Sequence, residues 1–245
     1  HRPAAGVGER VAEAALVPTL VVRQDEPFVR WADGERALRV VCAYDFTPTA
    51  DAALEWLNEL RRWGRCEIVV AQVDSPPEEK ARLGLPGPAR LDGNEDEVQT
   101  ILERDLTEHM HAVLDDAGAR IRVKGAWGRP DVDLIGIANL EQADVIVTGA
   151  HQRHGVGRLL HMSVSRALLR HAPMSVLVVP LTKAPKPIVR GSPERVLAAT
   201  DFSEAGDQAV QRAYALCGAG GLVRLVHVVH PHVLAPGAGG PGTGD

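Results

Sequence analysis

The residues that could bind an anionic ligand gather in one segment, which begins at Gly149 and ends at Ser163. Gly155 and Gly157 also fall within it, after an apolar run typical of a buried strand and before a helical pattern. A glycine-containing loop that leaves a strand and enters a helix can present backbone N–H groups to a phosphate. Four basic side chains could add positive charge or could form only a solvated loop face: His151, Arg153, His154 and Arg158.

Other sets of reactive side chains lack the spacing that their chemistry requires. Ser163 and Ser165 are not part of the G-x-S-x-G turn that exposes a nucleophilic serine. No G-K-[ST] sequence occurs, which excludes a Walker-type phosphate loop. The histidines near the loop are not completed by a cysteine or by paired carboxylates, as a zinc site would require. We therefore expect no catalytic residue and no metal site.

The amino-acid composition limits the kinds of molecule that this protein is expected to bind. The 245 residues have a net charge of −5 and are 45% hydrophobic, which is enough to supply a core. An acidic balance argues against general nucleic-acid binding, and no run of about 18 apolar residues could span a membrane. Cys42, Cys66 and Cys217 are widely spaced and odd in number, which fits a reducing compartment. We expect a cytoplasmic protein without nucleic-acid or membrane partners.

Short Val- and Ile-rich runs alternate with amphipathic helical patterns through the middle of the chain. Strands that are apolar on both faces belong in parallel sheets covered by helices on both sides. Residues 37–181 are therefore expected to form one doubly wound α/β domain, with a mobile loop at 74–93. The expected strands are 38–43, 66–73, 121–126, 145–149 and 175–179, and the expected helices are 50–63, 95–117, 132–140 and 163–170.

Both ends of the chain repeat parts of this domain. Residues 195–210 match residues 39–54 at a constant offset of 156, and residues 7–22 resemble residues 164–179 at an offset of 157. Repetition at a fixed offset indicates a tandem array. The expected parts are the end of one unit at 1–30, a whole unit at 37–181, a linker at 183–193, the start of a further unit at 194–233 and a disordered tail at 234–245.

Three segments of the central domain resemble the universal stress protein family. They read AYDFTPTADAALEWL from Ala43, TGAHQRHGVG from Thr148 and SVSRALLRHAPMSVLVVP from Ser163. The resemblance implies an α/β fold of the adenine nucleotide alpha hydrolase-like type: a five-stranded parallel sheet, order 3-2-1-4-5, with helices on both faces. It also implies dimerisation through the fifth strand and, in some members, ATP binding.

The resemblance further implies an ATP loop of the form G-x2-G-x9-G-[ST] after the fourth strand. On this chain the pattern places Gly149 first, Gln152 and Met162 where glycine is expected, and Ser163 last, followed by Val164 at the helix start. Side chains at glycine positions obstruct the close approach of phosphate oxygens to the backbone. The sequence therefore predicts a degenerate ATP loop, in which two of the three glycines of the family's pattern are replaced.

Two further positions match the family's nucleotide contacts. Asp45 corresponds to the acidic residue that faces the adenosine part, and Val73 to the residue whose backbone contacts adenine. An aspartate that follows a strand can equally cap the next helix. Asp45 therefore has two interpretations.

These observations predict a regulatory stress-response protein that acts as a non-catalytic interaction module, with no cofactor and at most weak ATPase activity. The alternative is a nucleotide-responsive regulator with ATP as the cofactor. The last expected strand, 175–179, should pair with a second copy in a homodimer or with residues 19–22 of the same chain, because unpaired apolar edges aggregate. We also expect protein clients, whose identity the sequence does not give.

Overall fold

A computed structural model describes residues 7–85, 96–114, 118–126, 128–150, 164–181, 195–217 and 219–228. The chain divides into two compact units, residues 1–188 and residues 189–245. The expected linker at 183–193 and the expected tail at 234–245 lie outside the described residues. The assignment of 1–30 and 194–233 as partial repeat units stays a prediction.

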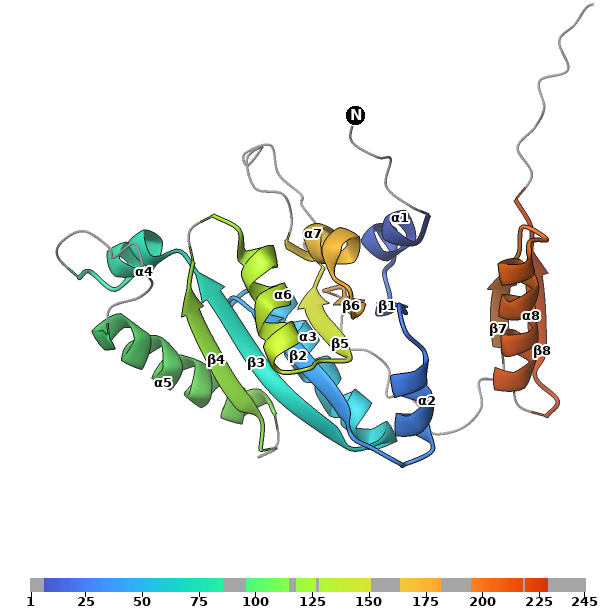
Figure 1. Ribbon diagram of the computed structural model, residues 1–245, viewed down its shortest axis with the longest axis horizontal. Helices are drawn as coiled ribbons and strands as arrows, with labels where there is room; N and C mark the ends of the chain where they lie inside the picture. The colour runs from blue at the N-terminus through green and yellow to red at the C-terminus, as the bar shows by residue number, and fades with distance from the viewer. Residues whose placement is uncertain are drawn as a thin grey trace, which may run out of the picture. The chain divides into compact units, whose positions relative to one another are not determined.

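A six-stranded sheet forms the centre of the larger unit (Figure 1). The α/β fold is confirmed, but the prediction of a five-stranded, all-parallel sheet is wrong, and the order of the whole sheet differs from 3-2-1-4-5 because a strand is added; the five expected strands are parallel and keep that order among themselves. A sixth strand, β1, joins one edge and runs antiparallel to its neighbour β6. The strands are β1 (Thr19–Val21), β2 (Leu38–Tyr44), β3 (Cys66–Asp74), β4 (Arg120–Gly125), β5 (Val145–Gly149) and β6 (Ser175–Val179), in the order β1-β6-β5-β2-β3-β4.

Helices cover both faces of this sheet. One core joins the sheet to α3 and α5, and the other joins it to α1, α6 and α7. The expected loop at 74–93 contains a helix, α4, which begins with two prolines and two glutamates, residues that favour a first helical turn. The helices are α1 (Val7–Ala14), α2 (Glu26–Ala32), α3 (Pro48–Trp63), α4 (Pro76–Arg82), α5 (Asp96–Val113), α6 (Pro130–Leu140) and α7 (Val164–His171).

The central strand β2 is buried on both faces because its side chains alternate between the two cores. Val40 and Cys42 pack in the core with α3 and α5, whereas Val41 and Ala43 pack in the core with α6 and α7. All four are at most 8% exposed. This two-sided burial explains the unbroken apolar run in the sequence.

The smaller unit contains a two-stranded parallel sheet and one helix: β7 (Arg195–Ala199), α8 (Glu204–Leu216) and β8 (Leu222–Val226). Its elements follow the same order as β2, α3 and β3. Phe202 repeats the left-handed backbone of Phe46, with φ of 61° against 56°. The repeated sequence therefore forms the same strand-to-helix turn in both units.

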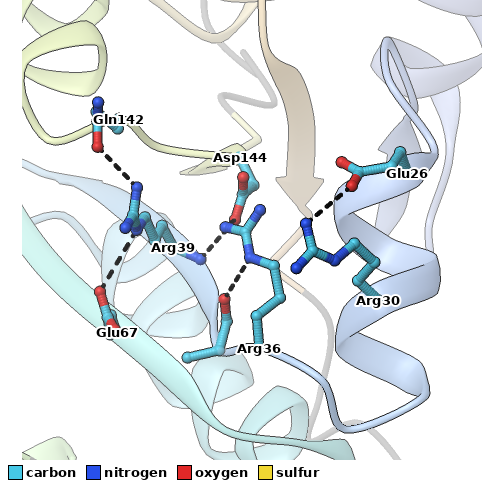
Figure 2. Close-up of polar contacts among 8 residues, drawn as sticks. Glu26, Arg30, Arg36, Arg39, Glu67, Gln142 and Asp144 are labelled. Atoms are coloured by element: carbon cyan, nitrogen blue, oxygen red, sulfur yellow. Dashed lines mark hydrogen bonds and ion pairs between the residues drawn. The ribbon is translucent and has the colours of Figure 1, made fainter.

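A largely buried carboxylate, that of Asp144, lies beside Arg36 and Arg39 at the amino end of the larger sheet (Figure 2). Asp144 Oδ2 accepts hydrogen bonds from Arg36 Nη2 at 2.5 Å and from the Arg39 backbone N–H at 2.8 Å. The Asp144 backbone N–H donates to the Arg39 carbonyl, and its carbonyl accepts from the Ser175 N–H. One residue thus fixes the starts of β2, β5 and β6.

We expect Asp144→Ala to lower the free energy of unfolding by about 2 kcal/mol, because it removes a carboxylate that is hydrogen-bonded and only 9% exposed. Urea denaturation measures the change. The matched control is Glu67→Ala, since the Glu67 carboxylate is 60% exposed and lies 3.6 Å from Arg39 Nε. Its loss should cost less than about 1 kcal/mol. Equal losses in the two variants would contradict this role for Asp144.

Candidate ligand site at the carboxyl edge of the sheet

Three of the predicted site residues converge at the carboxyl edge of the sheet. Asp45 directly follows β2, Val73 lies near the end of β3, and Gly149 ends β5. The parallel registers of β2 with β3 and with β5 bring these ends together. The chain leaves β2 toward β3 on one side and returns through β5 on the other, and open α/β sheets bind ligands at such a switch point.

The loop that would complete the site lies outside the described residues. Val164 is described and begins α7, which enters the sheet's second core. The structure therefore places Asp45, Val73, Gly149 and Val164. The predicted site residues outside the described ranges are Gln152, Met162 and Ser163.

The Asp45 carboxylate is used to build the turn into α3. Its Oδ1 accepts hydrogen bonds from the Thr47 backbone N–H at 3.2 Å and from the Thr47 hydroxyl at 2.5 Å. Thr47 is the N-cap of α3, and its Oγ1 accepts from the Ala50 N–H. Phe46 supplies the left-handed residue between them. Asp45 thus stabilises the helix start through Thr47, while its side chain stays exposed at the sheet edge.

Gly149 allows a close contact between the end of β5 and the first turn of α3. A Cβ at this position would lie 2.4 Å from the carbonyl oxygen of Thr49 and 2.5 Å from its carbonyl carbon. Backbone atoms cannot yield to such an overlap without moving the strand or the helix. Glycine is therefore required here for packing alone, whatever ligand the edge holds.

A polar cluster joins the end of β2 to α3 and α5 beside this edge. The Tyr44 hydroxyl donates to Asp51 Oδ1 at 2.5 Å, and His109 Nε2 lies 2.9 Å from the same oxygen. The Phe46 ring packs edge-on against Tyr44, with centroids 5.1 Å apart. Burial, with the Asp51 hydrogen bond, raises the pKa of Tyr44. Sequence reasoning missed this cluster, because its three polar residues come from different elements.

A guanidinium–carboxylate pair lies where the chain leaves β4 for α6. Arg129 Nε and Nη2 donate to Asp131 Oδ1 and Oδ2 at 3.0 and 2.8 Å. These bonds lower the pKa of Asp131, which is 5% exposed in the first turn of α6. The pair stabilises the helix start through charge and through the helix dipole.

The described residues offer little support for a reactive thiol or a metal site. Burial raises the pKa of Cys42 to about 12 and the pKa of Cys66 to about 11, so both thiols stay protonated at neutral pH. Within the described ranges no three His, Cys, Asp or Glu side chains are placed to hold a metal ion. In those same ranges no helix is long and apolar enough to cross a membrane.

The fold and the site together define the class of protein: a doubly wound α/β unit with polar side chains at the carboxyl edge of its sheet. The model of the universal stress protein family matches residues 37–180. The chain belongs to this family.

The chain is also similar to individual proteins. Universal stress protein MJ0577 of Methanocaldococcus jannaschii is 26% identical over 151 residues, which are 58% of this chain and 93% of that protein. A solved universal stress protein from Archaeoglobus fulgidus is 21% identical, covers 71% of this chain and 53% of its own, and superposes with a TM-score of 0.46. A second universal stress protein structure from Archaeoglobus fulgidus, solved in complex with dAMP, is 20% identical. The match covers 58% of this chain and 97% of that chain, with a TM-score of 0.39.

We expect Gly149→Ala to lower the free energy of unfolding by about 2 kcal/mol, because the new methyl group overlaps the Thr49 backbone. Chemical denaturation measures it. The matched control is Gly136→Ala in α6, where a Cβ would meet nothing within 4 Å. That variant should gain about 0.5–1 kcal/mol, since alanine favours helix. A neutral Gly149→Ala would contradict the packing role.

The pKa of Asp131 makes a prediction about acid stability. Because the folded-state pKa is lowered, the pair's contribution is present above the unfolded value of about 4 and is lost as pH falls through the folded value. Asp131→Asn should cost about 2 kcal/mol at neutral pH, and the gap to the wild type should shrink toward about pH 3. Denaturation curves across this range test it. A gap that does not change with pH would show that Arg129 does not act on the carboxylate charge.

Proposed function

We propose that this member of the universal stress protein family is a non-catalytic interaction module of the stress response, with a degenerate ATP loop and protein clients. The proposal rests mainly on the close approach of Gly149 to the Thr49 backbone, which leaves no room for a Cβ. Gly149 is the first glycine of the loop pattern, and its presence is explained by packing. Asp45 likewise has a role in the fold through Thr47. Neither residue needs a nucleotide to account for it.

The loop sequence supports the same proposal. Gln152 and Met162 occupy the other two glycine positions of the pattern. A Cβ at these positions obstructs the approach of phosphate oxygens to the backbone, and Met162 adds a long side chain at the start of a helix. A binding site that has lost its close backbone approach keeps little affinity for a triphosphate.

Absence of catalysis is part of the proposal, with at most weak ATPase activity. His109 and Asp51 form a histidine–carboxylate pair, and Asp51 Oδ1 is shared with the Tyr44 hydroxyl. That arrangement joins two helices to β2. A general base needs an activated nucleophile within hydrogen-bond reach, and the hydroxyl that this pair holds is the Tyr44 phenol, whose raised pKa keeps it protonated.

A nucleotide-responsive regulator is the second candidate. One observation favours it: the Asp45 side chain is exposed at the switch point, beside the ends of β3 and β5. Such an edge is where a nucleotide would bind in a doubly wound sheet. ATP is the cofactor that this candidate would take. Other universal stress proteins have been solved with cAMP and with dAMP, which makes these two nucleotides suitable probes.

We expect titration calorimetry of the full chain with ATP, dAMP and cAMP to show no binding at micromolar concentrations. The control is the double variant Gln152→Gly with Met162→Gly, which restores both glycines and should raise ATP affinity at least about tenfold, or about 1.4 kcal/mol. A micromolar dissociation constant for the wild type would overturn the proposal in favour of the second candidate. If the double variant gains nothing, the loop has diverged toward another ligand.

A further inference from the structure

The sheet of the smaller unit has a second face, opposite the one on which α8 packs (Figure 1). Because side chains alternate along a strand, this second face carries every other residue of β7 and β8. Its apolar side chains are exposed: Leu197 is 67% exposed, Leu222 53% and Val226 36%. We call it the open face, and its residues, all of them exposed, are Arg195, Leu197, Ala199, Leu222, Arg224 and Val226.

The larger unit shows what covers the equivalent face of its own sheet. The register of β7 with β8 repeats that of β2 with β3, since Leu197 lies opposite Arg224 as Val41 lies opposite Val69. In the larger unit this face packs in one core with α6, and Val41 is 0% exposed. A position that is fully buried under a helix is therefore open in the smaller unit. Clustered apolar side chains that stay exposed mark interaction surfaces.

The arginines of the open face lack the partners that the equivalent arginine of the larger unit has. Arg39, the equivalent of Arg195, donates from Nη1 to Gln142 Oε1 at 2.8 Å, just beyond the end of α6. Its Nε also lies 3.6 Å from Glu67 Oε2, and in the smaller unit a leucine takes the place of this glutamate. Within the part of the chain that the structure describes, neither Arg195 nor Arg224 forms an ion pair. The open face thus combines apolar side chains with uncompensated positive charge.

We propose that the open face is a docking surface for an acidic amphipathic helix of a partner protein. The apolar stripe of that helix would lie on Leu197, Leu222 and Val226, in the place that α6 has on β2 and β3. Carboxylates on the same stripe would accept hydrogen bonds from Arg195 and Arg224. This surface goes beyond the function proposed above, because it belongs to the smaller unit and shares no residue with the candidate ligand site.

Charge argues against a second copy of this chain as the occupant. The open face has two arginines and no acidic residue, so two copies packed face to face would place guanidinium groups of the same sign in one apolar layer. Unpaired charges that are removed from water destabilise an interface. A helix with carboxylates supplies the missing negative charge.

A peptide with the sequence of α6 and its end, residues 130–142, is a suitable probe, because it is amphipathic and carries three carboxylates. Its matched control has the substitutions Asp131→Asn, Asp133→Asn and Glu141→Gln, which remove the charge and keep the shape. Fluorescence anisotropy of the labelled peptides, titrated with the full-length chain, measures binding. We expect the acidic peptide to bind at least about tenfold more tightly than its amide control. Equal binding of the two peptides, or no binding of either, would overturn the inference.

Two matched variants of the full-length chain locate the contact. Leu197→Asp places a charge in the centre of the open face, whereas Leu216→Asp places it on α8, on a side chain that is 61% exposed. Leu197→Asp should weaken binding of the acidic peptide at least about tenfold, and Leu216→Asp should leave it unchanged. The same loss in both variants would show that the peptide binds elsewhere.

A charge reversal keeps the test decisive if Leu197→Asp folds poorly. Arg224→Glu leaves every apolar residue of the open face in place, and it should weaken the acidic peptide while it strengthens a peptide with Asp131→Lys and Glu141→Lys. An unchanged preference for the acidic peptide would contradict the role of Arg224. Light scattering checks the alternative occupant: a wild-type mass that is twice that of Leu197→Asp would show that the open face binds a second copy instead of a helix.

Discussion

The architecture of the larger unit depends on the burial of β2 between two apolar cores. Val40 and Val41, adjacent in sequence, are 1% and 0% exposed on opposite faces. This requires helices on both sides and neighbouring strands on both edges, which β3 and β5 supply. With faces and edges occupied, only the strand ends can meet solvent. At the amino end, the hydrogen bonds of Asp144 join the starts of β2, β5 and β6, whereas the carboxyl end carries the exposed Asp45.

At that carboxyl end, residues with a family role also have a role in the fold. Asp45 holds the capping threonine of α3, and Gly149 lets β5 reach the same helix turn. Their presence therefore follows from the geometry of the strand-to-helix connection and says little about nucleotide binding. In the proposed reading of the loop, Gln152 and Met162 stand where the family's pattern expects glycine.

The edge of the sheet beyond β6 is closed by a strand from the N-terminal part of the chain. An exposed apolar strand needs a neighbour, because its backbone groups are otherwise unsatisfied. Here β1 supplies that neighbour and runs antiparallel to β6, with Leu20 opposite Leu177. This added strand makes the sheet six-stranded and mixed.

The local sequence determined the type and the position of most helices and strands of the larger unit. The expected strands at 145–149 and 175–179 coincide with β5 and β6, because a short run of β-branched residues indicates burial without knowledge of the neighbours. Tertiary structure alone decided the antiparallel place of β1, the overlap that demands Gly149, and the meeting of His109 with Asp51 across 58 positions. Such features depend on which distant segments become adjacent. Periodicity records whether a side chain is buried, but it does not record what it is buried against.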